Sequence, residues 1–290
     1  MRWWCSADGS AWTWTWKPYL GSWLFVGLVG FAFWKAGAFR SSIELKRRLA
    51  AFAGLAIILI SIEWPLAALG AGYLASAQMI RQVLVVLIAM PLLLYGSPES
   101  FGRWLTATKR RRAVLHKLTY PLGAMLLAVG LLFAVNLPIF VDPLVKTQIG
   151  SFGVDVLWLV AGFIMWLPVQ PPRGMKPRLA GAPSIVYLVG VSVAPLPIAF
   201  FMTWSTLPLF EVYELAPRVF PGLDVSSDQE FAAAIFQVLG GLVIWIQIAG
   251  RFVHMASGPR ARGPRGRFVP STPVESSPAT SQPVSSATTI

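Results

Sequence analysis

Seven apolar segments, separated by short polar connections, constrain this chain more than any other feature of its sequence. An α-helix needs about 20 apolar residues to cross about 30 Å of hydrocarbon, because it rises about 1.5 Å per residue. The segments close to this length are residues 19–39, 49–69, 75–95, 118–137, 152–168, 183–204 and 231–252. The sequence therefore predicts an all-α, polytopic membrane helix bundle with seven transmembrane helices.

The composition agrees with a membrane protein and excludes several other classes. Hydrophobic residues make up 56% of the chain and charged residues 12%, whereas soluble domains are roughly 45 to 50% apolar and 25% charged. The net charge of +12 does not indicate nucleic-acid binding, because the basic residues lie in short gaps between apolar segments. One cysteine and two histidines exclude a multi-histidine metal, haem or catalytic site within one chain. We also find no Ser/His/Asp set, phosphate-binding glycine loop or paired catalytic carboxylates, so we expect no enzyme.

The charges of the connections alternate along the chain. Basic residues crowd the connections after the first, third and fifth segments, at Arg40, Lys46, Arg47, Arg48, Arg103, Lys109, Arg110, Arg111, Arg112, Lys117, Arg173, Lys176 and Arg178. The connection after the second segment has no charge. Those after the fourth and sixth are mainly acidic and hold Asp142, Lys146, Glu211, Glu214, Arg218, Asp224, Asp228 and Glu230. The positive-inside rule then predicts that the N-terminus is outside and the C-terminus cytoplasmic.

Two terminal regions flank a predicted membrane domain of residues 19–256. Residues 1–18 contain five tryptophans, whose rings favour the headgroup layer, so we expect an interfacial lead-in and no cleaved signal peptide. Residues 257–290 are rich in Gly, Pro and Arg and then in Ser, Thr and Pro. This composition predicts a disordered cytoplasmic tail. Its arginines could contact anionic lipid headgroups, but we favour the simpler interpretation that they only set the topology.

The third segment begins with an unusually polar stretch. Gln78, Arg81 and Gln82 lie in its first turns. An arginine near the bilayer centre costs roughly 2.5 to 3.5 kcal/mol, so Arg81 needs a partner or must reach the interface.

With the predicted orientation, the other polar groups of the apolar segments lie at the same level, toward the outer leaflet. The candidate site residues are Glu63, Gln78, Met79, Arg81, Gln82, Asn136, Asp155, Asp228 and Gln229. One interpretation is an outward-facing polar pocket. The other is a set of interhelical hydrogen bonds worth about 0.6 kcal/mol each, with one ion pair between Arg81 and either Glu63 or Asp155. The sequence leaves both open.

Several motifs follow one another in a characteristic order. They are Ser76-Ala77-Gln78-Met79-Ile80-Arg81-Gln82, Pro91-Leu92-Leu93, Gly96-Ser97-Pro98, Val135-Asn136-Leu137-Pro138, Ser151 to Asp155, Met165-Trp166-Leu167-Pro168, Asp228-Gln229-Glu230-Phe231-Ala232 and Gly240-Gly241. This order resembles the multi-span CtaG family of cytochrome c oxidase assembly proteins, distinct from the single-span copper chaperone of the same name. The resemblance covers residues 12–255 and implies the family scaffold, a bacterial inner membrane location and a role in terminal oxidase assembly.

The chain departs from the family where copper-binding histidines are expected. Those positions hold Gln78, Gln82, Asn136, Ser151 and Asp155. A carboxamide is a poor copper ligand. Arg81 replaces a glutamine of the family, and a cation about 4 Å away would be repelled by about 4 kcal/mol at an effective dielectric constant of 20. Copper is therefore implied by the family, but we expect no cofactor here.

Three hypotheses for function follow. The first is a divergent oxidase assembly factor that acts by protein–protein contact with oxidase subunits. The second is a small-solute or anion carrier that holds a negative ligand at Arg81, with the Pro195/Pro197 break as its moving part. The third is Cu(I) binding through Met79, Cys5 and Asp155.

Overall fold

The computed structural model describes residues 2–40, 42–194, 196–205 and 207–257. Within these ranges the chain forms helices, turns and loops without a strand, so the predicted all-α fold is confirmed. Pro195 and residues 258–290 of the predicted tail lie outside the described residues.

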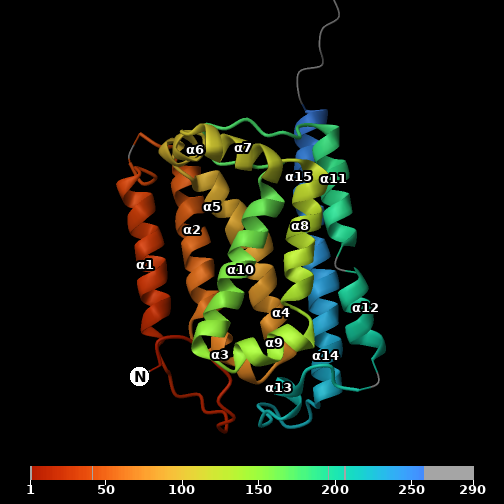
Figure 1. Ribbon diagram of the computed structural model, residues 1–290. Coiled ribbons are helices and arrows are strands. Elements are labelled where there is room, and N and C mark those ends of the chain that lie inside the picture. Colours follow the sequence, from red (N-terminus) through yellow and green to blue (C-terminus); the bar gives the residue numbers. More distant parts are fainter. Residues whose placement is uncertain (1, 41, 195, 206, 258–290) are drawn as a thin grey trace, which may run out of the picture. The chain divides into compact units, whose positions relative to one another are not determined.

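Long helices run side by side through the molecule, and short helices lie at its two ends (Figure 1). Four of the long helices are single elements: α1 (Leu20–Lys35), α2 (Leu45–Ile62), α8 (Pro121–Ala134) and α10 (Gln148–Trp166). The others are built from consecutive elements: α4 (Ala75–Val83), η1 (Leu84–Ala89) and α5 (Met90–Gly96); α11 (Ala182–Val193) and α12 (Leu196–Trp204); and α14 (Val225–Ala234), η2 (Ile235–Leu239) and α15 (Gly240–Ala256). The short helices α3 (Leu66–Gly72), α9 (Pro138–Val145) and α13 (Glu211–Glu214) lie at one end, and α6 (Glu99–Leu105) and α7 (Lys109–Leu118) lie at the other.

Among the described residues, four helices are long and apolar enough to cross a membrane: Ala75–Gly96, Gln148–Trp166, Ala182–Trp204 and Val225–Ala256. The count rises to six if α2 with α3 and α7 with α8 each form one bent span. The remaining apolar helix, α1, is shorter, at 16 residues.

Two predicted segments are bent where prolines interrupt them. The segment predicted at 49–69 is wrong as one continuous helix: α2 ends at Ile62 and turns by 47° into α3. The segment predicted at 118–137 begins within α7, which meets α8 at 78°. In both cases a proline, Pro65 or Pro121, cannot donate the helical hydrogen bond and disfavours a helical conformation for the residue before it.

The fifth and seventh segments are longer than predicted. The helix α10 starts at Gln148 instead of Phe152, because the Thr147 hydroxyl caps it by accepting a hydrogen bond from Gly150 N at 3.0 Å. The last span starts at Val225, six residues before the predicted position. Two π-helical segments, η1 and η2, were not predicted.

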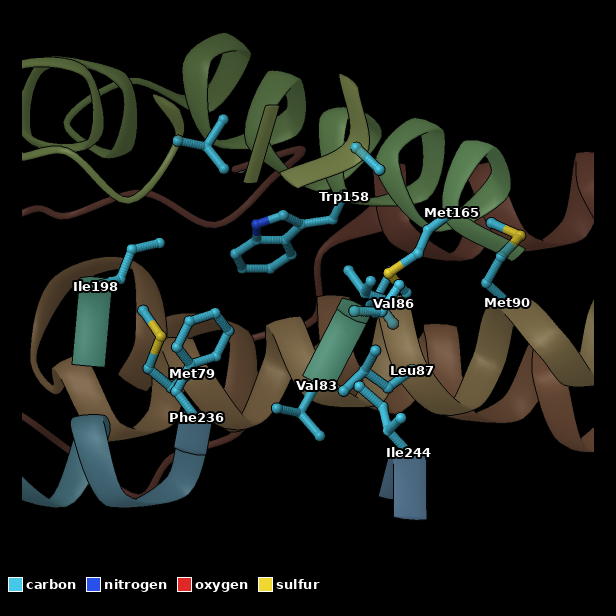
Figure 2. Close-up of a cluster of buried hydrophobic side chains, with 14 of the residues drawn as sticks. Met79, Val83, Val86, Leu87, Met90, Trp158, Met165, Ile198, Phe236 and Ile244 are labelled. Carbon is cyan, nitrogen blue, oxygen red and sulfur yellow. The ribbon is translucent and has the colours of Figure 1, made fainter. Parts of the chain in front are cut away.

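The main apolar core joins the third, fifth, sixth and last spans. Met79, Val83 and Val86 lie beside Trp158, Met165, Ile198, Phe236 and Ile244 of the other spans (Figure 2). The α2 and α5 helices approach closely at Gly96, where a Cβ atom would lie only 2.7 Å from the backbone oxygen of Arg47. A small residue is therefore required at this helix–helix contact.

Candidate functional site

Arg81 lies in the interior of the bundle with only 1% of its surface exposed. Its Nη2 donates to Asp155 Oδ1 of α10 at 2.7 Å, and its Nη1 donates to Gln78 Oε1 one turn earlier in α4 at 2.7 Å. Its Nε donates to the carbonyl oxygen of Ser61 at 2.7 Å. That carbonyl is free to accept because α2 ends at Ile62, and the last carbonyls of a helix have no intrahelical donor.

The N-terminal segment covers this ion pair at the end of the bundle that carries α3 and α9 (Figure 1). Trp4 Nε1 donates to Asp155 Oδ2 at 2.9 Å, so both oxygens of the carboxylate are engaged. Cys5 Sγ lies 3.3 Å from Ser151 Oγ and 4.0 Å from Arg81 Nη2. Neither Trp4 nor Cys5 exposes more than 1% of its surface. We define the Arg81 cluster as Trp4, Cys5, Ser61, Gln78, Arg81, Ser151 and Asp155.

Backbone contacts hold the N-terminal segment in place. Gln148 Oε1 accepts hydrogen bonds from the amides of Trp3 and Trp4 at 3.0 and 3.3 Å. The Trp4 ring packs edge-on against Phe152, with 4.9 Å between centroids.

Burial raises the pKa of the Cys5 thiol to about 11, against the opposing effect of the Arg81 charge. Cys5 is therefore a neutral thiol at physiological pH, and a neutral thiol is a poor nucleophile and metal ligand.

Of the predicted site residues, Gln78, Arg81 and Asp155 meet in the Arg81 cluster, and Glu63 and Asn136 do not. Glu63 lies in the break between α2 and α3, where its Oε1 accepts from the Tyr19 amide at 3.0 Å. Asn136 Nδ2 donates to the Leu132 carbonyl of its own helical turn at 2.6 Å. Arg81 thus pairs with Asp155 and not with Glu63.

Asp228 and Gln229 join other parts of the bundle. The Asp228 carboxylate accepts from the amides of Ala75 and Ser76, at 2.6 and 3.3 Å, and from the Ser76 hydroxyl. It therefore caps the N-terminus of α4, where a negative charge is favourable. The Gln229 side chain accepts from Leu209 N at 2.8 Å and donates to Met202 O at 2.9 Å, which ties α14 to α12 and the loop after it.

Gln82 and Met79 face apolar surroundings. Gln82 is 1% exposed, and neither its Oε1 nor its Nε2 has a hydrogen-bond partner among the described residues. Met79 belongs to the main core, near Phe236 (Figure 2).

Sequence reasoning missed two members of the Arg81 cluster. Trp4 could not be distinguished from the other tryptophans of residues 1–18 by its position in the sequence. Ser61 contributes its backbone carbonyl, which only the end of α2 makes available. Ser151 stood out in the sequence only through the resemblance to a known family.

The family described as cytochrome c oxidase caa3 assembly factor (Caa3_CtaG) has a model that matches residues 22–257. The chain belongs to this family. The matched region runs from α1 to the end of α15 and includes every element that contributes to the Arg81 cluster except the N-terminal segment. Searches among curated proteins and among solved structures gave no match.

Membership of the Caa3_CtaG family confirms the resemblance read from the motif order. It supports a role as a cytochrome c oxidase assembly factor. The apolar helices agree with a membrane protein.

Proposed function

We propose that this Caa3_CtaG chain is a seven-span assembly factor of the bacterial cytoplasmic membrane that acts by contact with oxidase subunits and without bound copper. The observation that carries the proposal is the Arg81–Asp155 ion pair, with 2.7 Å between Nη2 and Oδ1, buried at the head of the third span. A scaffold whose polar cluster satisfies itself internally is suited to present helix surfaces to a partner.

The span count follows if α1 and both bent pairs cross the bilayer. A helix of 16 residues is about 24 Å long, and tryptophans and tyrosine at its ends extend its reach into the interface. Four continuous spans, two bent pairs and α1 together give seven crossings.

The charge distribution supports the proposed orientation. The basic residues of α6 and α7, and those of the loop between α10 and α11, gather at the end of the bundle where α15 terminates (Figure 1). Asp142, Glu211 and Glu214 lie at the opposite end, in α9 and α13. The positive-inside rule then favours a cytoplasmic position for the α6–α7 end and an external position for the N-terminal segment.

The donor set of the Arg81 cluster does not suit a copper ion. The Arg81 guanidinium lies among the candidate ligands, both Asp155 oxygens accept hydrogen bonds, and Gln78 Oε1 accepts from Arg81. Among the described residues, no three His, Cys, Asp or Glu side chains lie close enough together to hold a metal ion. These contacts favour a structural role for Gln78 and Asp155, two of the residues at the family's histidine positions.

The same contacts weigh against an anion carrier. An arginine that binds an anion needs access and an unneutralised charge, whereas the Arg81 guanidinium already pairs with the Asp155 carboxylate at 2.7 Å and the side chain is 1% exposed.

Affinity purification of the tagged chain from native membranes, with mass spectrometry of partners, tests the proposal. We expect oxidase subunits to copurify, and deletion of the gene to lower oxidase activity. Normal oxidase activity in the deletion strain, together with no captured oxidase subunit, would contradict it. A tagged unrelated multi-span protein from the same membranes is the control for non-specific capture.

A further inference from the structure

An apolar groove lies against α4 and η1, and no residue of the Arg81 cluster lines it. Its walls come from the third span, α8, α10, α11, α12 and the last span. They include Val86, Leu87, Phe236 and Ile244, which are labelled in Figure 2. The cavity has a volume of about 40 Å³. None of the described residues that line it is charged.

Gln82 is the buried polar residue of this groove. It lines the cavity, is 1% exposed and has no hydrogen-bond partner for either amide atom. A buried polar group without a partner costs about 1 to 3 kcal/mol, and in an apolar membrane interior no bulk water is present to satisfy it. The groove therefore contains one unmet donor and one unmet acceptor in an otherwise apolar wall.

The backbone around the groove is also unusual. Val86 and Leu87 belong to η1, whereas Phe236 and Gln237 belong to η2, so both π-helical segments contribute to the wall. Such segments are rare in proteins, and those that occur are frequently found at functional sites. The Trp166 indole donates to the carbonyl of Val86 at 2.8 Å and braces η1 from the side of α10.

The rim of the groove lies beside exposed apolar side chains, which is typical of a surface that faces lipid. Ser192 and Ala194 are half-buried at its edge, and the neighbouring Val193 and Leu242 are 53% and 54% exposed. A ligand can therefore enter from the bilayer without crossing an aqueous phase.

We propose that this groove binds a neutral membrane amphiphile with a slim apolar chain that ends in a hydroxyl group. A hydroxyl both donates and accepts, so it can satisfy both Gln82 atoms, whereas an ester or quinone carbonyl only accepts. An uncharged wall favours a neutral ligand. The cavity is about a quarter of the roughly 150 Å³ of a cavity that binds benzene, so it admits a chain end but not a ring of that size. This site is independent of the oxidase role.

Photolabelling of the full-length protein in phosphatidylcholine vesicles tests the proposal. One probe is a long-chain primary alcohol with a diazirine next to the hydroxyl-bearing carbon, and the other is the matched hydrocarbon without the hydroxyl. We expect the alcohol to label η1 and η2 at least about fivefold more than the hydrocarbon, because one ordinary hydrogen bond already supplies that ratio. Peptide mass spectrometry locates the labelled residues.

Three variants complete the test. Gln82→Leu should reduce labelling by the alcohol to the level of the hydrocarbon, and Gln247→Leu, a matched change on α15 outside the groove, should not. Gly240→Val should reduce labelling by both probes: a Cβ there would lie 3.5 Å from Leu87 Cδ1, an ordinary contact, so the added methyl groups fill the groove. Equal labelling by the two probes in the wild type, as expected if water alone satisfies Gln82, would overturn the proposal. So would alcohol labelling that survives both Gln82→Leu and Gly240→Val.

Discussion

The indole N–H of Trp4 and the carboxylate of Asp155 are 151 positions apart in the chain and 2.9 Å apart in the structure. The same carboxylate holds Arg81 through its other oxygen. The N-terminal segment, α4 and α10 therefore meet at one buried charge pair. A substitution that disturbs any one of these three segments should therefore destabilise the packing of the other two.

Replacing one member of the Arg81–Asp155 ion pair should destabilise the protein more than replacing both. Asp155→Leu or Arg81→Met alone leaves an uncompensated buried charge and should lower the free energy of unfolding by about 3 to 5 kcal/mol. The double variant removes both charges and should recover at least half of that loss. Unfolding of the purified protein in mixed detergent micelles, titrated with a denaturing detergent, measures the difference.

The surface pair Lys146–Glu211 is the control for this cycle. Its atoms are 3.2 Å apart, but the side chains are 45% and 61% exposed. Lys146→Met should change stability by less than about 1 kcal/mol. Additive losses at Arg81 and Asp155 would show that the two residues do not interact.

The Trp4 hydrogen bond should fix the N-terminal segment. Trp4→Phe keeps a ring against Phe152 but removes the donor to Asp155, and a bond to a charged group is worth about 1.5 to 3 kcal/mol. We expect Cys5, which is fully buried, to become reactive toward a maleimide. Trp14→Phe, at a position 60% exposed in the same segment, should leave Cys5 protected. Equal labelling of the two variants would contradict the prediction.

Asp228 should stabilise the first turn of α4, at the start of the third span. Asp228→Ala removes the acceptor for the Ala75 and Ser76 amides and should cost about 0.5 to 2 kcal/mol, as loss of a helix cap does. Hydrogen exchange at the start of α4 should accelerate. Glu230→Ala, an exposed acid two residues later, is the control. If the exchange rates at Ala75 and Ser76 do not change, the cap has no energetic role.

The N-terminal segment should also loosen in acid through Asp8. Partial burial raises the pKa of this carboxyl, but hydrogen bonds from Ser10 and the charge of Arg2 outweigh it, so the pKa lies below its usual value of 3.8. Because the folded-state pKa is lowered, the stabilisation is complete above the unfolded-state pKa and is lost as the pH falls through the folded-state pKa.

Hydrogen exchange of residues 2–10 in the wild type and in Asp8→Asn measures this effect. At neutral pH the wild type should be better protected than the variant. The difference should begin to shrink as the pH falls below 3.8 and vanish once the pH lies below the folded-state pKa. A difference that persists or grows in acid would contradict the assigned sign.

The sequence was sufficient to predict the class of fold and the need for a partner at Arg81, because apolar length and the cost of a buried charge are local properties. The choice between Glu63 and Asp155 was not predictable. A sequence gives the depth of a residue along a helix, but the direction in which it faces depends on bends such as the one at Pro65, which takes Glu63 to the Tyr19 amide. The burial of Trp4 and the isolation of Gln82 depend on tertiary packing in the same way.

The copper content of the purified full-length protein tests the central claim most directly. The protein is expressed with copper supplied, isolated in mild detergent and analysed by elemental mass spectrometry beside its Arg81→Gln variant, which restores the neutral side chain of the family motif. We predict no copper above background in the wild type, because the Arg81 guanidinium and its bond to Asp155 fill the cluster. Stoichiometric copper in the wild type, lost on Met79→Leu, would contradict the account.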